Sequence, residues 1–110
     1  MLLKNKIFEG ERSLFASSNL VIDECIFQNG ESPLKESENI ELFNTTFKWK
    51  YPLWYCNSVK VMNSYLDVTA RSGIWYTSNI VINNSVIDAP KTFRRSEEII
   101  LNNVKLNNAL

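Results

Sequence analysis

Two aspartates occupy equivalent places in the sequence and could carry acid chemistry. Asp67 follows Leu66 and Asp88 follows Ile87, at the ends of two similar segments about 20 residues apart. If these segments stack on one another, the two carboxylates come within about 5–7 Å of each other. Such a pair could form half of a calcium site or the acid/base pair of a glycosidase. The simpler interpretation is a pair of solvent-exposed acids near surface arginines. The residues equivalent to the pair are Gln28, Lys48 and Asn107, and the arginines are Arg71, Arg94 and Arg95.

A set of aromatic residues is the stronger candidate for a binding surface. Each of its tryptophans follows an apolar residue that should point inward, so we expect the tryptophans to point outward. Exposed rings of this kind stack on sugar rings. Two structural interpretations stay open: an aromatic stack between successive segments, capped by a cation–π contact from an arginine, and burial under a neighbouring subunit or under a further part of the chain. The set consists of Trp54, Trp75, Tyr55, Tyr76 and Arg94.

Composition narrows the remaining chemistry. The 110 residues contain no histidine, which removes the commonest general acid/base and the commonest metal ligand. Twelve Lys+Arg balance twelve Asp+Glu, which argues against a nucleic-acid-binding surface. No apolar stretch suits a membrane span or a signal peptide, so we expect a cytoplasmic protein. Cys25 and Cys56 fit a reduced compartment and lack zinc spacing, so beyond the calcium option we expect no metal or other cofactor.

A repeat of about 20 residues organises the chain. Five copies align in register, and each contains two apolar residues spaced by two, as in a half-buried strand. A third apolar residue follows at an odd spacing, which indicates a corner between them. Asparagine suits such a corner because it tolerates the left-handed backbone conformation. The expected corner residues are Glu24, Asn44, Asn63, Asn84 and Asn103.

The spacing of a second apolar column predicts the fold. It lies six residues before the first column in every copy, while length varies only in the segment after each copy. A fixed core with one variable corner is typical of a solenoid. We predict an all-β, right-handed, single-stranded parallel β-helix that forms one domain over residues 1–110. It should have about five coils, or solenoid turns, of about 20 residues and three short strands each. The second column is Leu14, Leu34, Leu53, Ile74 and Phe93.

Stacked coils also account for the composition, which includes 14 asparagines and only four alanines. Identical residues in successive coils lie above one another, so asparagine amides can bond along the solenoid axis. We expect such a ladder at Asn44, Asn63, Asn84 and Asn103. A column of small residues should fill the narrow space beside this corner: Cys25, Thr45, Ser64 and Ser85.

The repeat resembles known β-helix proteins. Its pattern Asn/Ser-x-aliphatic-x-aliphatic-x-Asn-Ser/Thr is similar to that of the pectate-lyase-like superfamily. The segments Leu53-Trp54-Tyr55-Cys56 and Ile74-Trp75-Tyr76-Thr77 resemble more closely the DUF3737 family of bacterial proteins of unknown function. The resemblance covers nearly the whole chain and implies a β-helix without implying an activity. Because members of that family look longer, it also implies an N-terminal segment, truncated at an open C-terminal coil whose strand edges invite pairing.

These observations favour a binding or scaffolding role, with carbohydrate as the partner of the aromatic set. Asp67 and Asp88 are the accompanying polar candidates, and no catalytic residue is assigned. Two alternatives stay open. The chain could form part of a polysaccharide lyase or another carbohydrate-active enzyme whose remaining site lies outside this segment. It could also be a structural solenoid that forms homo-oligomers through its open coil end. Neither nucleic acid nor a membrane is an expected partner.

Overall fold

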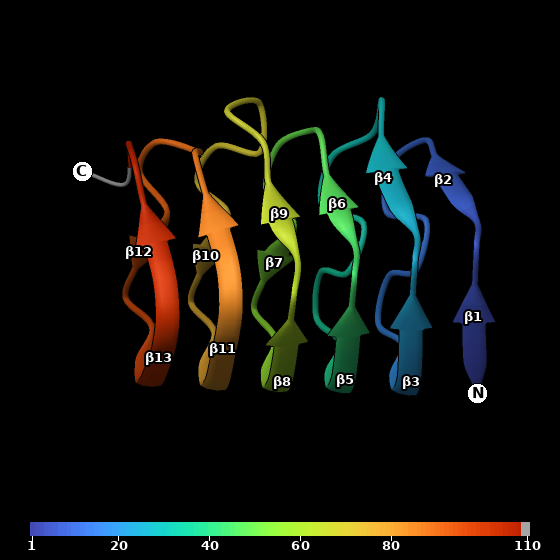
Figure 1. The fold of residues 1–110 in the computed structure, drawn as a ribbon. Helices are drawn as coiled ribbons and strands as arrows, with labels where there is room; N and C mark the ends of the chain where they lie inside the picture. Colours follow the sequence, from blue (N-terminus) through green and yellow to red (C-terminus); the bar gives the residue numbers. More distant parts are fainter. Residues whose placement is uncertain (109–110) are drawn as a thin grey trace.

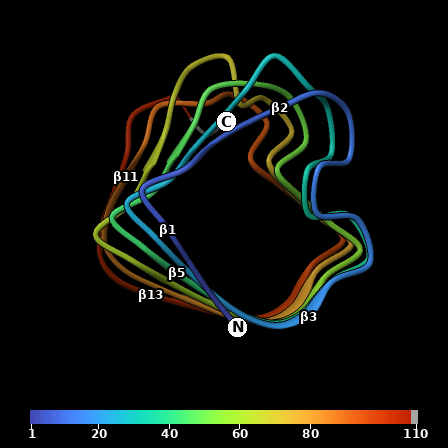
Figure 2. The same cartoon turned by 90° about the vertical axis from the view of Figure 1, so that its right-hand side faces the viewer.

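A computed structural model describes residues 1–108, which form a right-handed solenoid of parallel strands (Figures 1 and 2). The solenoid has about 6 turns of roughly 19 residues and contains no helix within the described residues. None of these residues therefore belongs to a helix that could cross a membrane. The strands are β1 (Leu2–Lys4), β2 (Ile7–Glu9), β3 (Ser18–Asp23), β4 (Ile26–Gln28), β5 (Glu38–Phe43), β6 (Thr46–Phe47), β7 (Leu53–Trp54), β8 (Asn57–Met62), β9 (Tyr65–Leu66), β10 (Ile74–Trp75), β11 (Ser78–Ile87), β12 (Phe93–Arg94) and β13 (Glu97–Leu106).

Every strand pairs in parallel with the strand one coil away. One sheet is formed by β1, β3, β5, β8, β11 and β13 on one side of the solenoid, and it continues around a corner into β9, β6, β4 and β2. The corner does not interrupt β11 or β13, each of which runs through it as one strand of 10 residues. A smaller sheet of β7, β10 and β12 forms the opposite wall. A coil such as the one with β7, β8 and β9 thus has the three expected strands.

The structure adds one N-terminal coil to the five expected from the sequence. Leu3 pairs in register with Ile22, and Phe8 with Phe27, so β1 and β2 repeat the pattern of β3 and β4. The repeat was missed here because Lys6 takes the place of the small residue at Cys25.

Left-handed backbone turns give each coil four corners rather than one. Among the described residues, 22 that are not glycine have positive φ, and all but Asn29 fall into four columns. The expected corner is confirmed, with φ of 50° to 54° from Glu24 to Asn103. We call this column the asparagine corner. Figure 2 shows the resulting four-sided outline. The columns are Asn5, Glu24, Asn44, Asn63, Asn84 and Asn103; Arg12, Ser32, Tyr51, Ser72 and Lys91; Ala16, Glu36, Tyr55, Tyr76 and Arg95; and Asn19, Asn39, Ser58, Asn79 and Glu98.

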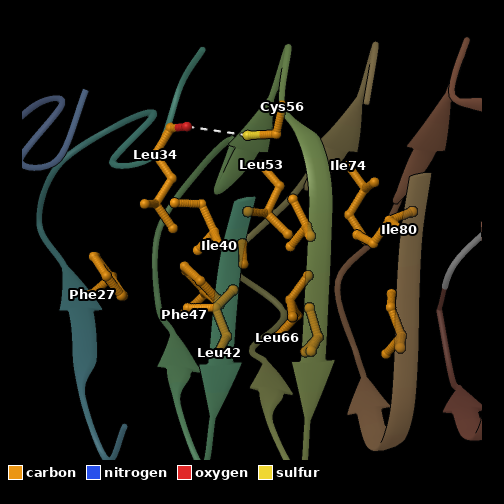
Figure 3. Close-up of a cluster of buried hydrophobic side chains, with 14 of the residues drawn as sticks. Phe27, Leu34, Ile40, Leu42, Phe47, Leu53, Cys56, Leu66, Ile74 and Ile80 are labelled. Atoms are coloured by element: carbon orange, nitrogen blue, oxygen red, sulfur yellow. Dashed lines mark hydrogen bonds between the residues drawn. The ribbon is translucent and has the colours of Figure 1, made fainter. Parts of the chain in front are cut away.

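The core consists of stacked columns of identical or similar side chains (Figure 3). Phe27 lies between Phe8 and Phe47, with ring centroids 4.9 Å apart on each side. Aliphatic columns of the long sheet and of the opposite wall fill the rest of the interior, and their inner members are almost completely buried. Because each inner residue touches its counterparts above and below, the repeat itself determines the packing. The most buried of these residues are Ile22, Leu34, Ile40, Leu42, Phe47, Leu53, Val61, Leu66, Ile74, Ile80, Ile82 and Ile87.

The small polar column is confirmed and has a defined hydrogen-bonding role. The Ser64 hydroxyl accepts a hydrogen bond from the backbone N–H of Thr45 at 3.1 Å and donates one to the carbonyl of Met62 at 2.9 Å. The Ser85 hydroxyl accepts in the same way from the N–H of Ser64 at 3.0 Å. Buried backbone N–H groups require such partners. Each hydroxyl therefore satisfies a backbone donor of the coil before it.

A parallel column of small residues holds the second cysteine. Thr77 accepts from the backbone N–H of Cys56 at 3.3 Å, and the Cys56 thiol donates to the carbonyl of Leu34 at 3.1 Å (Figure 3). Cys25 and Cys56 are both free and buried, as expected for packing residues. Burial raises the pKa of the Cys56 thiol to about 11. A thiol in this state is a poor nucleophile.

The asparagine ladder forms, but only in part at the expected place. Asn103 donates to the Asn84 side chain at 2.8 Å, whereas Asn44 donates to Asp23 at 3.1 Å. The prediction of one continuous ladder from Asn44 to Asn103 was therefore wrong. Side chains at a corner diverge as they leave the backbone. An asparagine amide there can therefore donate either to its own column or to a side chain of the adjacent column. Further Asn–Asn hydrogen bonds lie elsewhere: Asn102 to Asn83 in the adjacent column, and Asn39 to Asn19 and Asn79 to Asn57 at the corner where the long strands begin.

Candidate functional site

The aromatic set lies on one short face of the solenoid. In one coil this face runs from the corner at Tyr51 to the corner at Tyr55, with Trp54 between them on β7. Trp54 pairs in register with Trp75 on β10, and Trp75 pairs with Arg94 on β12. Parallel pairing at about 4.8 Å per coil places these side chains directly above one another. We call the outward side chains here the aromatic face: Tyr51, Trp54, Tyr55, Trp75, Tyr76 and Arg94.

The two tryptophans form a continuous stack. Their ring centroids are 5.1 Å apart with an interplanar angle of 5°. Tyr51 packs on the other side of Trp54 at 4.3 Å, and the Arg94 guanidinium lies 5.0 Å from the ring centroid of Trp75. Both indole N–H groups donate to backbone carbonyls, Trp54 to Ser72 at 2.6 Å and Trp75 to Lys91 at 2.9 Å. The geometry is that of the structural alternative, an aromatic stack capped by a cation–π contact.

A second stack runs beside the first. The rings of Tyr55 and Tyr76 are 4.7 Å apart with an interplanar angle of 7°, and the Lys35 ammonium lies 5.8 Å from the centre of the Tyr55 ring. Tyr55 is 50 % exposed, more than any other aromatic side chain of this face. Sugar stacking requires a free ring face. Because neighbours lie against the ring faces in both stacks, mainly ring edges and cations meet the solvent.

A row of cations ends the aromatic face and was missed from the sequence. Lys91, Arg94 and Arg95 are all exposed and occupy the same three places as Tyr51, Trp54 and Tyr55 two coils earlier. The sequence assigns only Arg94 to the aromatic set, because only its column contains tryptophan. Lys91 and Arg95 could have been found from their spacing. They lie three residues before and one residue after Arg94, just as Tyr51 and Tyr55 lie around Trp54. We call these three residues the cationic row.

The two aspartates form a separate place on the solenoid. Asp67 donates its backbone N–H to the carbonyl of Phe47, and Asp88 donates its own to the carbonyl of Leu66, which confirms that they share a column. They follow strands of the long sheet rather than the aromatic face. The described residues show no hydrogen bond between these carboxylates and any aromatic-face side chain. The predicted set of candidate site residues is therefore split into two groups.

Asp88 is held as a carboxylate by its neighbours. Its side chain accepts hydrogen bonds from the Tyr65 hydroxyl at 2.6 Å and from the Asn107 amide. These two hydrogen bonds, with the charge of Lys105, keep the pKa of Asp88 below its ordinary value. The same contact with Asp88 is the main cause that raises the pKa of Tyr65 to about 12. A general acid needs a raised carboxyl pKa, so this environment suits a structural carboxylate better than the acid of a glycosidase.

The Tyr65–Asp88 contact predicts a pH dependence that can be measured. Since the folded-state pKa of Tyr65 is raised, its contribution to stability is complete below about pH 10 and disappears as the pH rises towards 12. For Asp88 the pKa is lowered, so its contribution is present above about pH 4 and disappears as the pH falls through the lower folded-state value. Replacing Asp88 with asparagine should move the Tyr65 pKa back towards 10. Tyrosinate absorbance during an alkaline titration measures this, and an unchanged titration curve would contradict the assignment.

Three hollows in the surface of the described residues are open grooves rather than enclosed pockets. One groove of about 490 Å³ follows the asparagine corner and is lined by Asn44, Asn63, Asn84, Tyr65 and Val86, among others. Small-molecule sites are usually more enclosed clefts. Within residues 1–108, no group of three or more acidic, histidine or cysteine side chains is placed to hold a metal ion.

Comparison with known proteins identifies the family. None of the curated proteins compared with the chain matches it. A family model described as "Protein of unknown function (DUF3737)" matches residues 1–110, which is the whole sequence. The expected resemblance is thus confirmed at the level of the family, and its description assigns no activity. On this match, the solenoid with its stacked aromatic face belongs to the DUF3737 family.

Proposed function

We propose that this chain is a non-catalytic binding scaffold whose aromatic face and cationic row bind an acidic polysaccharide. The observation that carries the proposal is the arrangement of Arg94. Its guanidinium lies over the Trp75 ring, which fixes its position, while the side chain remains exposed. A guanidinium held in this way can present its N–H edge to a carboxylate as a bidentate donor.

The charge distribution supports an anionic partner. Residues 48–95 contain seven Lys+Arg and two Asp+Glu, although the whole chain has no net charge. Three of these cations form the cationic row, and Arg71 is also exposed. Such a patch raises the local concentration of anions at the surface. Neutral sugars carry no charge that these cationic side chains could recognise. The expected ligand groups are therefore the carboxylates along an acidic sugar chain, rather than the sugar rings themselves.

A polysaccharide is favoured over single-stranded nucleic acid by the covered rings. Nucleic-acid binding without sequence preference depends on bases that stack on free aromatic faces. Here Tyr51, Trp54, Trp75 and Arg94 cover one another in a single stack. The exposed edges and cations can still contact the rim of a sugar chain and its carboxylates. The shallow grooves are compatible with a polymer that lies across several coils.

Binding of polygalacturonate and of an uncharged glucan, measured by calorimetry, tests this proposal. We expect binding to polygalacturonate only, and Arg94→Ala should weaken it by roughly 10-fold or more, the effect of losing a charge-assisted hydrogen-bonding group. Arg12→Ala is the matched control, because Arg12 also lies over an aromatic ring, that of Phe15 at 5.4 Å, but at the other end of the solenoid. Its affinity should remain unchanged.

Three results would overturn the proposal. One is the absence of polygalacturonate binding by the folded chain. Another is equal weakening by the Arg94 and Arg12 substitutions, which would indicate general charge attraction. The third is equal affinity for a single-stranded oligonucleotide at the same salt concentration. Circular dichroism of each variant separates loss of binding from loss of structure.

A further inference from the structure

We infer that Asn29 is a covalent modification site, where the side chain loses ammonia spontaneously and the residue becomes aspartate or isoaspartate. Asn29 belongs to neither the aromatic face nor the cationic row, so the inference is independent of the proposed polysaccharide site. Three features of this residue carry it: an exposed side chain outside the corner columns, a free backbone N–H on the next residue, and the glycine found there.

Deamidation of asparagine is an intramolecular reaction of the backbone. The nitrogen of the following residue gives up its proton to hydroxide and attacks the side-chain Cγ. A bond from this nitrogen to Cγ forms, the bond from Cγ to Nδ2 breaks, and ammonia leaves. Water then opens the five-membered imide at one of its two carbonyls. The net reaction converts an amide and water into a carboxylic acid and ammonia, with no oxidation or reduction, and it is one reason why asparagine is a labile residue.

The position of Asn29 suits this reaction. Its side chain is exposed and its φ is 54°, yet it is the only non-glycine residue of positive φ among residues 1–108 that lies outside the four corner columns. It follows directly after β4, which pairs with β2 on one side and with β6 on the other. The surroundings of Asn29 are therefore those of an inner coil. Exposed turns of this kind are the least restrained parts of a fold.

Gly30 provides the attacking nitrogen. It belongs to no strand, and its N–H makes no backbone hydrogen bond within the described part of the chain. A Cβ at this position would collide with the carbonyl oxygen of Gly10 in the preceding coil, so close packing of the two coils requires glycine here. The same requirement leaves the attack unhindered, because no side chain stands beside the nitrogen.

The asparagines of the asparagine corner are protected by contrast. Asn44 is followed by Thr45, whose N–H donates to the Ser64 hydroxyl at 3.1 Å. Asn63 is followed by Ser64, whose N–H donates to the Ser85 hydroxyl at 3.0 Å. A buried N–H that is held in a hydrogen bond cannot readily lose its proton or turn towards the neighbouring side chain. The small polar column therefore protects these two asparagines as well as satisfying the backbone.

Conversion of Asn29 also changes a contact between two coils. The Glu9 carboxylate accepts a hydrogen bond from the Gln28 amide at 2.7 Å and a second from the Asn29 amide at 3.4 Å. Deamidation replaces the second donor with a carboxylate. Two negative charges then face each other where a hydrogen bond joined the coils, and like charges at this distance repel. The modification should therefore weaken the attachment of the first coil.

Peptide mapping by mass spectrometry, during incubation of the folded chain at neutral and at mildly alkaline pH, tests the inference. We expect Asn29 to lose its amide first, and faster at the higher pH because the attacking nitrogen must be deprotonated. Asn5 is the internal control, since it is also exposed with a φ of 57° and lies outside the strands, but Lys6 follows it. Asn29→Gln should remove the modification, because the longer side chain closes a ring less readily.

The same map shows whether the fold controls the reaction. Asn63 should remain intact in the folded chain and become susceptible in urea. The inference is wrong if Asn29 keeps its amide while Asn5 or Asn63 is modified, or if Asn29 reacts only in urea, since the fold would then protect this site too. Equal loss at Asn63 with and without urea would contradict the protection by the small polar column.

A further pair of variants tests the consequence for the two coils. Asn29→Asp copies one product of the reaction and should lower the thermal midpoint. Adding Glu9→Gln removes the facing carboxylate and should restore the midpoint. Equal midpoints of the unmodified chain and Asn29→Asp, or no recovery with Glu9→Gln, would overturn the assigned repulsion.

Discussion

Replacing Phe47 with alanine is expected to lower the free energy of unfolding by about 3–5 kcal/mol. Phe47 is 1 % exposed, stacks on Phe27 at 4.9 Å and lies in an inner coil. Removing its ring leaves a cavity that the fixed spacing of the coils cannot close, because the backbone above and below is held by strand pairing. Since a domain of this size is stable by only about 5–15 kcal/mol, the loss should be visible as a large fall in urea or thermal midpoint.

The same stack supplies the control for this prediction. Phe8→Ala removes an identical ring from the end coil, where the residue is only partly buried and has a neighbour on one side. Its effect should be clearly smaller than that of Phe47→Ala. Equal effects would contradict the view that burial between two coils determines the stability of a column. Because solenoids can unfold from their ends, both variants should be followed by more than one probe.

Trp75→Ala is expected to lower the free energy of unfolding by about 2–3 kcal/mol, although Trp75 is only partly buried. The substitution removes three interactions together: the stack on Trp54, the contact with Arg94 and the indole hydrogen bond to the carbonyl of Lys91. If Trp75 served only as a surface for a ligand, its removal would leave stability nearly unchanged. Thermal unfolding in the absence of any polysaccharide therefore measures how much the Trp75 contacts contribute to the stability of the fold.

Trp49→Ala is the matched control for this experiment. Trp49 is 38 % exposed in a connecting segment, and the Lys50 ammonium lies 5.4 Å from its ring centroid, but no other aromatic ring among residues 1–108 stacks on it. We expect a change of about 0.5 kcal/mol or less, as for most surface substitutions. A loss at Trp49 as large as that at Trp75 would indicate that ring burial, rather than stacking between coils, stabilises this part of the solenoid.

The fold could be predicted because its information is repeated in every coil. A column such as Leu34, Leu53 and Ile74 is read from spacing alone, and the same spacing places the columns in register. The small polar column was predicted in the same way, since hydroxyl residues recur at one position. The spacing does not predict the first coil, because Lys6 replaces a small residue of the small polar column there. Sequence repetition therefore predicts inner coils, whose residues have a coil on each side, better than the first coil.

Directions and partners of outward side chains could not be predicted in this way. The sequence places Trp54 above Trp75, but it does not say whether their rings lie face to face or spread apart into solvent. The asparagine ladder shows the same limit, because Asn44 chooses Asp23 of the adjacent column over Asn63. Asp88 was aligned correctly with Asp67, yet its contact with Tyr65 depends on the reach of a side chain two positions before the column. Register is determined by the backbone, whereas these contacts depend on side-chain rotamers.

The four left-handed corners separate the residues that form the core from the residues that form the surface. Except for the buried Ser32 and Ser72, residues in this backbone conformation hold their side chains away from the core, and the columns contain asparagine, serine, glutamate, alanine, tyrosine, lysine and arginine, but no valine, isoleucine or threonine. β-Branched residues are excluded because their side chains clash in this conformation. Among the permitted residues, charge and aromaticity can change from coil to coil without altering the interior. Related chains could thus acquire different surface specificities by corner substitutions alone, while inheriting the same core.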